Sequence, residues 1–240
     1  MDDGVDADAR ASRSMRHPIV RFARARPRLN FASPTFWDDR YADDPDDETE
    51  WLLAYDGALE NAIEQHAGSS RGLPLLELGC GSSPLCARLH AAGFVDILAT
   101  DVSAAAVRAA AARHSLPGLR FEKADALALP FADASFATVI DKGTLDAILC
   151  SDAFDVDVPR MAREVERVLR RDGRWLCVSL NQPALVLPLL QSVGSLRVSA
   201  VPLARPEWAQ SPAAVAEVVG LGAPPLVAAG GVHMYVCSSS

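Results

Sequence analysis

The sequence lacks the features of several common functional classes. None of its stretches contains about 18 consecutive uncharged apolar residues, so it predicts no membrane-spanning helix. Its five cysteines are scattered and include no CxxC pair, which supports neither a disulfide framework nor a zinc site. We therefore expect a protein of a reducing compartment that binds no metal and no membrane.

Positive charge is scarce as well. The formal net charge is −8 and the sequence pI is about 5.1. No basic stripe is present that could contact a phosphate backbone, so we expect no nucleic-acid partner. We expect a monomer whose partner is a small molecule or another protein.

Familiar catalytic signatures are also missing. The sequence contains no hydrolase nucleophile elbow, no P-loop Gly-Lys-Ser/Thr and no pair of metal-binding histidines. Half of its residues are hydrophobic, which is enough to bury one sizeable core. We predict one domain over residues 34–240, with residues 205–231 left unplaced.

A tail over residues 1–33 precedes this domain and shows no apolar periodicity, so we expect it to be disordered. It begins with acids and then, from Met15 to Phe36, is rich in arginine and free of acids, which is the composition of a transit peptide. The acids at the start disfavour that interpretation, so we expect a cytoplasmic protein; the alternative is a mitochondrial one, if translation starts at Met15.

The stretch from Leu73 to Ser83 organises the rest of the chain. An apolar run ends in Glu77 and two glycines, Gly79 and Gly81, and a helix is predicted to follow with Ser83 as its N-cap. Strand, tight turn and helix in this order place the turn at the carboxyl end of a strand, where open α/β sheets bind ligands.

A second acid strengthens this interpretation. Asp101 ends the next apolar strand, about 20 residues after the glycine turn, as a ribose-binding acid does. A dinucleotide fingerprint would have a third glycine where this sequence has Pro84, which disfavours an NAD site. The turn matches better the nucleoside-binding turn of S-adenosylmethionine (SAM) enzymes, where no pyrophosphate is bound.

Strand and helix patterns alternate along the rest of the chain, which implies parallel strands joined by right-handed crossovers. The pattern predicts a Rossmann-like α/β fold: a seven-stranded sheet with helices on both faces and a C-terminal antiparallel hairpin. Strands are predicted at 73–78, 96–100, 119–123, 136–140, 175–180, 196–201 and 232–237. Helices are predicted at 56–65, 103–114, 158–169 and 184–193.

Four acids each follow or end an apolar strand, so we expect them at one edge of the sheet: Glu77, Asp101, Asp125 and Asp141. Asp101 would accept from ribose hydroxyls, and Asp125 with the Ala126 N–H would bind adenine. Asp141 and Lys142 would lie nearest the reacting group. One or two of these acids could instead cap the helices that follow them.

Aromatic residues flank an acidic segment, expected to be a loop, from Asp38 to Glu50. Trp37 and Tyr41 lie at one end of it and Trp51 at the other. These side chains either fasten the N-terminal segment to the core or form a wall of a nucleoside or sulfonium site, and the sequence leaves both open.

These segments together resemble the class I SAM-dependent methyltransferases. Within them the sequence is similar to the group that includes the elongation factor 1A lysine methyltransferases and the mitochondrial citrate synthase lysine methyltransferase. The matching segments are Phe36-Trp37-Asp38-x-Arg40-Tyr41, Glu50-Trp51, Leu78-Gly79-Cys80-Gly81-x-Ser83, Thr100-Asp101-Val102-Ser103 and Asp141-Lys142-Gly143-Thr144-Leu145-Asp146-Ala147.

The resemblance implies a role for each matching position. Aromatic side chains would close over the cofactor, Gly79 would meet its methionine part, and other residues would hold the ribose and adenine or border the site. The implied cofactor residues are Trp37, Tyr41, Trp51, Gly79, Asp101, Val102, Asp125, Ala126 and Lys142, and the residues themselves add Glu77 and Gly81. The link between Asp146 and the helix expected at Val158 is shorter than in some relatives, which leaves the substrate open.

The expected reaction is transfer of the SAM methyl to an exposed lysine of a partner protein, with S-adenosylhomocysteine as the other product. Asp141 and Asp146 are the candidate catalytic carboxylates, because they could orient the amine and relay its proton. Asn-Pro-Pro-Tyr does not follow the fourth predicted strand, which disfavours methylation of adenine or glutamine nitrogens. The alternatives are methylation of a small molecule on O or N, and a non-catalytic interaction module that keeps the SAM fold.

Overall fold

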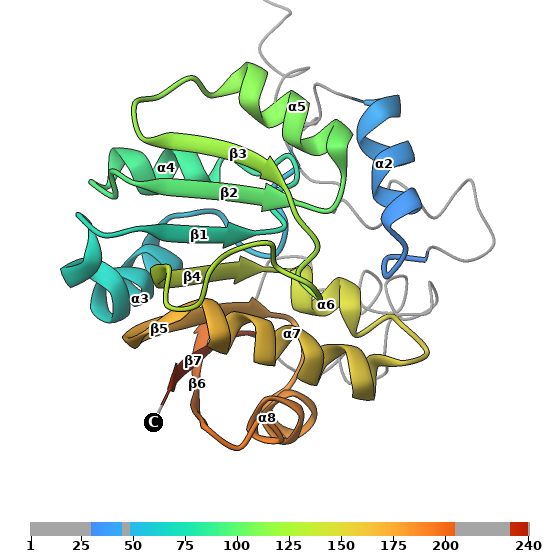
Figure 1. The fold of residues 1–240 in the computed structure, drawn as a ribbon, viewed down its shortest axis with the longest axis vertical. Coiled ribbons are helices and arrows are strands. Elements are labelled where there is room, and N and C mark those ends of the chain that lie inside the picture. Colours follow the sequence, from blue (N-terminus) through green and yellow to red (C-terminus); the bar gives the residue numbers. More distant parts are fainter. Residues whose placement is uncertain (1–29, 45–48, 205–230, 240) are drawn as a thin grey trace, which may run out of the picture.

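A computed structural model describes residues 30–44, 49–204 and 231–239 of the chain. The sheet has seven strands in the order β3-β2-β1-β4-β5-β7-β6 (Figure 1). The strands are β1 (Leu75–Leu78), β2 (Ile97–Asp101), β3 (Leu119–Lys123), β4 (Phe136–Lys142), β5 (Leu169–Ser179), β6 (Leu196–Ala204) and β7 (Val232–Ser239). β1 to β5 are parallel, and β7 runs antiparallel between β5 and β6. The predicted fold class and terminal hairpin are confirmed.

The helices lie on both faces of the sheet. They are α2 (Pro34–Asp43), α3 (Gly57–Ala67), the 3₁₀ turn η2 (Gly68–Ser70), α4 (Leu85–Ala91), α5 (Ala104–Arg113), α6 (Thr144–Ile148), α7 (Phe154–Val168) and α8 (Pro183–Gln191). Because strand side chains alternate between faces, Leu75 and Leu76 enter different clusters. Leu75 packs in the cluster that includes α3 and α4, whereas Leu76 packs with α7 and α8.

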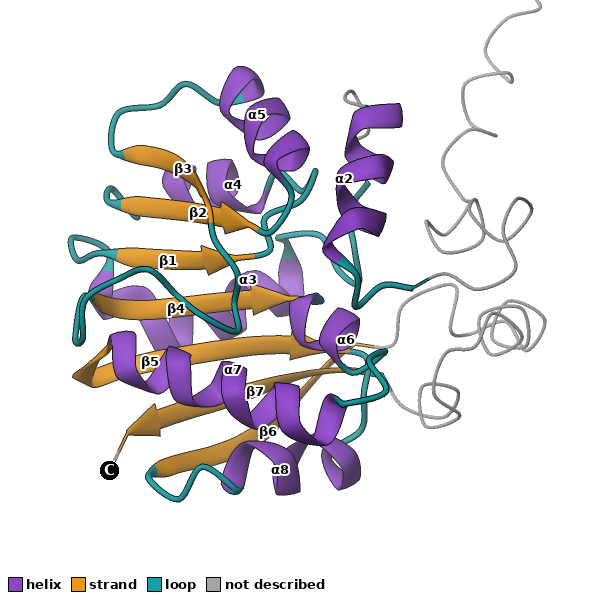
Figure 2. Cartoon of the chain, turned by 45° about the vertical axis from the view of Figure 1, so that its right-hand side comes forward, coloured by secondary structure: helices purple, strands orange, loops and turns teal. Residues whose placement is uncertain are grey.

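The chain order reverses at β1, because β2 lies on one side of β1 and β4 on the other. Ligands of open α/β sheets bind at such a switch point, outside the carboxyl ends of the strands. In Figure 2 the arrowheads of β1, β2 and β4 point toward the side of the molecule where α2 and α6 lie. The fold therefore brings these two helices to the edge at which a ligand is expected.

Several predicted boundaries were wrong. Residues 38–43, expected in an acidic loop, belong to α2, and α6 was not predicted. β5 begins at Leu169, six residues before its predicted start, because Arg171, Asp172 and Gly173, which are residue types common in turns, lie inside the strand, where the register with β4 shifts. α7 begins at Phe154 and ends at Val168, before the predicted Leu169. α4 begins at Leu85, so Pro84 rather than the predicted cap Ser83 directly precedes the helix. The N–H of Leu85 still donates to Ser83 Oγ, over 3.2 Å.

Part of the predicted tail belongs to the fold. Phe31 packs on the rings of Phe36 and Trp37, with centroids 5.1 and 5.9 Å apart, and its carbonyl accepts from Trp37 Nε1. The targeting segment expected before it and the unplaced residues 205–230 lie outside the described residues. Within the described ranges, no helix has both the length and the apolar character needed to cross a membrane.

Candidate active site

The glycine turn after β1 is shaped by two left-handed residues. Gly79 has φ +65° and Gly81 has φ +50°, a region that side chains with a Cβ rarely adopt. A Cβ on Gly79 would meet Thr144 Oγ1, and one on Gly81 would meet the Tyr41 hydroxyl. Both glycines therefore let the turn lie close to α6 and α2.

Asp101 ends β2 next to this turn. Its Oδ2 accepts from Gly81 N over 2.9 Å and its Oδ1 accepts from Ser103 N over 2.8 Å. Burial raises the pKa of this carboxyl to about 6, while these backbone donors pull it back. A carboxylate has about four lone-pair sites, so two remain that can accept from the hydroxyls of a ribose.

Helix α2 carries the aromatic side of the site. Trp37 stacks on Tyr41 with ring centroids 5.8 Å apart and meets Trp51 edge-on at 5.9 Å. The Arg40 guanidinium lies over the rings of both Tyr41 and Trp51, at 5.5 and 5.2 Å. Asp38 Oδ1 accepts from Ser103 Oγ over 2.7 Å, which fastens α2 to the first residue before α5.

Three polar residues form what we call the Glu50 clasp. Glu50 Oε1 accepts from Lys142 Nζ at 2.5 Å and from Ser83 Oγ at 2.8 Å. Lys142 Nζ also donates to the carbonyl of Trp51 over 2.7 Å, and only 3% of its side chain is exposed. The clasp holds the segment that carries Trp51 against the ends of β1 and β4.

Asp141 lies at the end of β4 but does not reach the cavity. Its Oδ1 accepts from Thr144 N at 2.9 Å and from Leu145 N at 3.3 Å, so it caps the first turn of α6. Gly143, at φ +89°, turns the chain from β4 into that helix. Burial raises the pKa of Asp141 to about 7.

Asp146 on α6 is held by residues at the end of β5. Its Oδ1 accepts from Ser179 Oγ and from Asn181 Nδ2, each at 2.5 Å, and its Oδ2 accepts from Leu180 N at 3.3 Å. Burial raises its pKa, which these donors oppose. Asp146 thus joins α6 to β5 across the sheet edge.

A cavity of about 1030 Å³ lies at this edge. Of the thirteen residues predicted for the site, twelve line it: Trp37, Tyr41, Trp51, Glu77, Gly79, Gly81, Asp101, Val102, Asp125, Ala126, Lys142 and Asp146. The exception is Asp141. Asp125 is exposed, and its Oδ1 accepts from Leu127 N over 2.9 Å, as an acid that closes a turn does.

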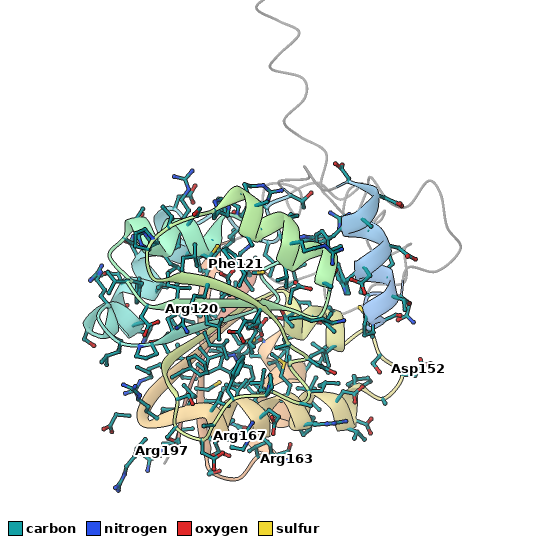
Figure 3. All side chains as sticks on the ribbon, turned by 45° about the horizontal axis from the view of Figure 1, so that its top comes forward. Arg120, Phe121, Asp152, Arg163, Arg167 and Arg197 are labelled. Carbon is teal, nitrogen blue, oxygen red and sulfur yellow. The ribbon has the colours of Figure 1, made fainter. Side chains whose placement is uncertain are left out.

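The cavity extends beyond the predicted residues at the end away from β2 and β3. Leu180 and Asn181 after β5, and the link between α6 and α7 with Cys150 and Asp152, line that end. Figure 3 labels Asp152 on this link. No motif marked these residues in the sequence, and Asn181 contacts Asp146 of α6 through tertiary structure alone.

Glu77 is a further buried acid of the cavity lining. It is buried in β1, and burial raises its pKa to about 8 although Lys142 lowers it. Its Oε2 has no hydrogen-bond partner among the described residues. A buried carboxyl with an unpartnered oxygen in a cavity is a place for a donor group of a ligand.

Several known methyltransferases are similar to this chain in sequence. Residues 76–177 match the family described as a methyltransferase domain. The chain is 36% identical over 157 residues to the eEF1A lysine and N-terminal methyltransferase of Mus musculus, and 35% identical over 159 residues to EEF1A lysine methyltransferase 4 of Bos taurus. The chain is therefore similar to SAM-dependent methyltransferases over this part of its length.

The chain spans only part of the length of the relatives that it matches. The alignment with the mouse protein covers 63% of this chain and 22% of that protein. The alignment with the bovine protein covers 62% of this chain and 61% of that protein. Among solved structures, a SAM-dependent methyltransferase from Mesorhizobium loti has a TM-score of 0.54, with 16% identity, 75% of this chain and 97% of that chain covered. This likeness bears on the fold.

The residues at this edge fit SAM, the cofactor of the proteins that the chain resembles. The two glycines leave the turn open to a ligand, Asp101 keeps free lone pairs, and Glu77 Oε2 is without a donor. Among the described residues, no group of three His, Cys, Asp or Glu side chains is arranged to hold a metal ion.

Proposed function

We propose that this methyltransferase transfers the methyl of SAM to the side-chain amine of a lysine in a partner protein, and that elongation factor 1A is the first partner to test. One observation carries the proposal: the cavity continues past the residues suited to a nucleoside into a second end lined by Asp146, Asn181 and the α6–α7 link. The names of the mouse and bovine relatives, both acting on eEF1A, support the choice of an amine on a protein.

The cofactor end would hold SAM along the carboxyl ends of three strands. Asp125 and Ala126 after β3 would bind the adenine, and Asp101 with Val102 after β2 would hold the ribose. Gly79 and Glu77 of β1 would face the methionine part, whose ammonium could donate to the unpartnered Glu77 Oε2. SAM supplies a methyl group made electrophilic by its sulfonium.

The aromatic residues would complete the cofactor end. Trp37, Tyr41 and Trp51 line the cavity from α2 and from the segment held by the Glu50 clasp. Their rings would exclude water, and the negative faces of aromatic rings attract a cationic group. We propose that Lys142 acts through Glu50 and Trp51 rather than by touching the methyl, because its Nζ already donates to both.

The acceptor amine must be neutral to react. With a lysine pKa near 10.4, neutrality at pH 7 costs about 4–5 kcal/mol. Partial burial of the amine in the cavity lowers this cost, because desolvation disfavours the ammonium form and its proton leaves to water. The amine lone pair then forms the N–C bond as the C–S bond breaks, and that electron pair stays on the sulfur of S-adenosylhomocysteine.

Labelling with radioactive SAM tests the proposal. Purified protein is incubated with tritiated SAM and purified elongation factor 1A, and mass spectrometry locates the methyl group on the labelled chain. We expect label on a lysine side chain, and much less with Gly81→Ala, a substitution expected to weaken SAM binding.

Other outcomes would contradict the proposal. If a proteome extract is labelled only in its low-mass, protein-free fraction, the acceptor is a small molecule. Label on an α-amine would move the substrate from lysine to a protein N-terminus. Purified protein that binds no SAM but captures a partner would identify a non-catalytic module.

A further inference from the structure

We propose that the side-chain oxygen of Asn181 accepts a hydrogen bond from the substrate amine, and that Asp146 is the positioning residue that turns this oxygen toward the cavity. The inference rests on the proposed methyl transfer and assigns a catalytic residue that no sequence motif indicated. In this proposal Asp146, a predicted catalytic carboxylate, acts through Asn181 and does not itself contact the amine.

Asn181 is held rigidly just after the end of β5. Its backbone N–H donates to Ser179 Oγ over 3.0 Å, and its carbonyl accepts from the Tyr235 hydroxyl over 2.6 Å. The residue is 2% exposed and lines the cavity. A side chain on a backbone held in this way, and itself bonded through Nδ2 to Asp146, loses little freedom when a ligand binds. This suits a group that must orient a reacting atom.

The hydrogen-bond network decides which end of the Asn181 amide faces Asp146. Ser179 Oγ accepts from Asn181 N, so its own proton is available to Asp146, and Leu180 N can only donate to Asp146. The Asp146 carboxylate therefore acts as an acceptor, and Asn181 must present Nδ2 to it, at 2.5 Å. The amide oxygen is then directed away from Asp146.

That oxygen has no hydrogen-bond partner among the described residues. Two carboxyl oxygens at this edge also have no hydrogen-bond partner among the described residues, Glu77 Oε2 and Asp141 Oδ2. Asp141 does not line the cavity, and Glu77 belongs to β1, next to the glycine turn at the cofactor end. Asn181 follows β5, which lies beyond β4 in the sheet order, and is therefore the unpartnered acceptor at the other end.

An amide oxygen suits the amine of a methyl acceptor better than a carboxylate does. A carboxylate beside the amine would stabilise the ammonium form and raise its pKa, which keeps the lone pair protonated. An amide oxygen accepts an N–H without carrying a full charge. One accepted N–H fixes the direction of the lone pair, and Asp146 polarises the amide from behind.

The test measures methyl transfer and SAM binding separately, with tritiated SAM, purified elongation factor 1A and calorimetry. We expect Asn181→Ala to lower kcat about 100-fold, the loss typical of a reactant displaced by about 1 Å. The Kd for SAM should change less than about threefold, because the cofactor contacts lie at the other end. Asn181→Leu, which keeps the packed volume, gives the same comparison if the alanine variant fails to fold.

Gln182→Ala is the matched control, because Gln182 carries the same amide on the next residue and does not line the cavity. Its kcat should equal that of the wild type. Asp146→Asn should lower kcat as much as Asn181→Ala, because an amide at position 146 can donate to the Asn181 oxygen and turn it away from the cavity. The double variant should lose no more than either single one, since both act on one contact.

Two failures are distinguishable. Wild-type protein that binds SAM but labels no protein overturns the proposed function, and the inference with it. Wild-type protein that labels elongation factor 1A, with kcat unchanged in both Asn181 variants, overturns the inference alone. Losses that add in the double variant would also overturn it, because they would show that Asp146 does not act through Asn181.

Discussion

The two ends of the cavity are built in different ways. At the cofactor end, the groups that hold Asp101 are backbone N–H groups of Gly81 and Ser103. At the acceptor end, the groups that hold Asp146 include the side chains of Ser179 and Asn181. Backbone donors are supplied by every residue type except proline, whereas a side-chain network depends on the identity of each member. The position of Asp101 should therefore depend on the backbone conformation of the turn, and the acceptor end should be the place where substrate choice is set.

Substitution of a turn glycine should have the largest effect on the cofactor end. Gly81→Ala places a Cβ against the Tyr41 hydroxyl and forces alanine to φ +50°. The left-handed conformation alone costs roughly 1–2 kcal/mol, and displacement of Tyr41 opens the aromatic side. We expect SAM affinity to fall more than about 100-fold, as measured by calorimetry.

Gly72→Ala is the control for this change, because nothing lies within 4 Å of a Cβ at that exposed position. Its SAM affinity should match the wild type. Retained affinity in Gly81→Ala would show that the turn does not limit the cofactor end.

Removal of the Asp101 charge should have the next largest effect. Asp101→Asn keeps the shape but replaces one acceptor oxygen by a donor that opposes Gly81 N or Ser103 N. A charge-assisted contact is worth roughly 1.5–3 kcal/mol, which corresponds to about 10- to 100-fold in SAM affinity. Asp96→Asn is the matched control, since Asp96 precedes the same strand and pairs with Arg120 at the surface. Equal affinities for the two variants would contradict the ribose role.

The Glu50 clasp should have a smaller effect, on the rate at which SAM leaves. Glu50→Gln removes the charge that Lys142 Nζ faces, while the Trp51 carbonyl keeps its donor. We expect SAM dissociation to accelerate about three- to tenfold, because changes at a binding site act mainly on the off-rate. Stopped-flow fluorescence of the site tryptophans measures this rate. The exposed Glu60→Gln serves as the control, and equal rates would show that the clasp does not hold Trp51.

The last prediction concerns stability and pH in the protein without SAM, where ligand contacts at either end play no part. Burial raises the pKa of Glu77 from 4.5 to about 8, so between these values the folded state keeps a proton that the unfolded state has lost. The free energy of unfolding should therefore fall as the pH rises from 5 to 8, by at most about 1.4 kcal/mol per pH unit for this group. Asp141, with a pKa of about 7, adds a fall of the same sign.

Urea unfolding at several pH values checks this dependence. Glu77→Gln should reduce the slope, leaving the part contributed by Asp141 and by the other acids whose pKa burial raises, Asp101 and Asp146. A slope that does not change in the variant would show that Glu77 is ionised in the folded protein.

The comparison also explains what could be predicted from the sequence. The glycine turn and Asp101 were found because strand, turn and acid follow one another at short spacing, and twelve of the thirteen predicted residues line the cavity. The acids from Asp38 onward predict a loop, although residues 38–43 belong to α2. The hydrogen bond that fastens this helix joins Asp38 to a distant residue, Ser103, which the local sequence does not indicate. Asn181 was missed because its partners Asp146 and Tyr235 lie 35 and 54 residues away.

Asp141 was predicted to lie in the site, but it does not line the cavity. Its place after an apolar strand predicted a position in the site, but the same place lets its carboxyl cap α6, which begins three residues later. A strand-ending acid can face a ligand or a helix, and the sequence does not distinguish the two where the helix is as short as α6.

The burial of Lys142 makes the clasp observable by simple chemistry. The chain contains two lysines, Lys142 in the clasp and Lys123 exposed at the end of β3. An amine-reactive reagent modifies Lys123 at all times, but it reaches Lys142 only when Glu50 and Trp51 have moved away. The ratio of the two modified peptides therefore reports the open fraction of the site, with Lys123 as the internal standard within the same molecule.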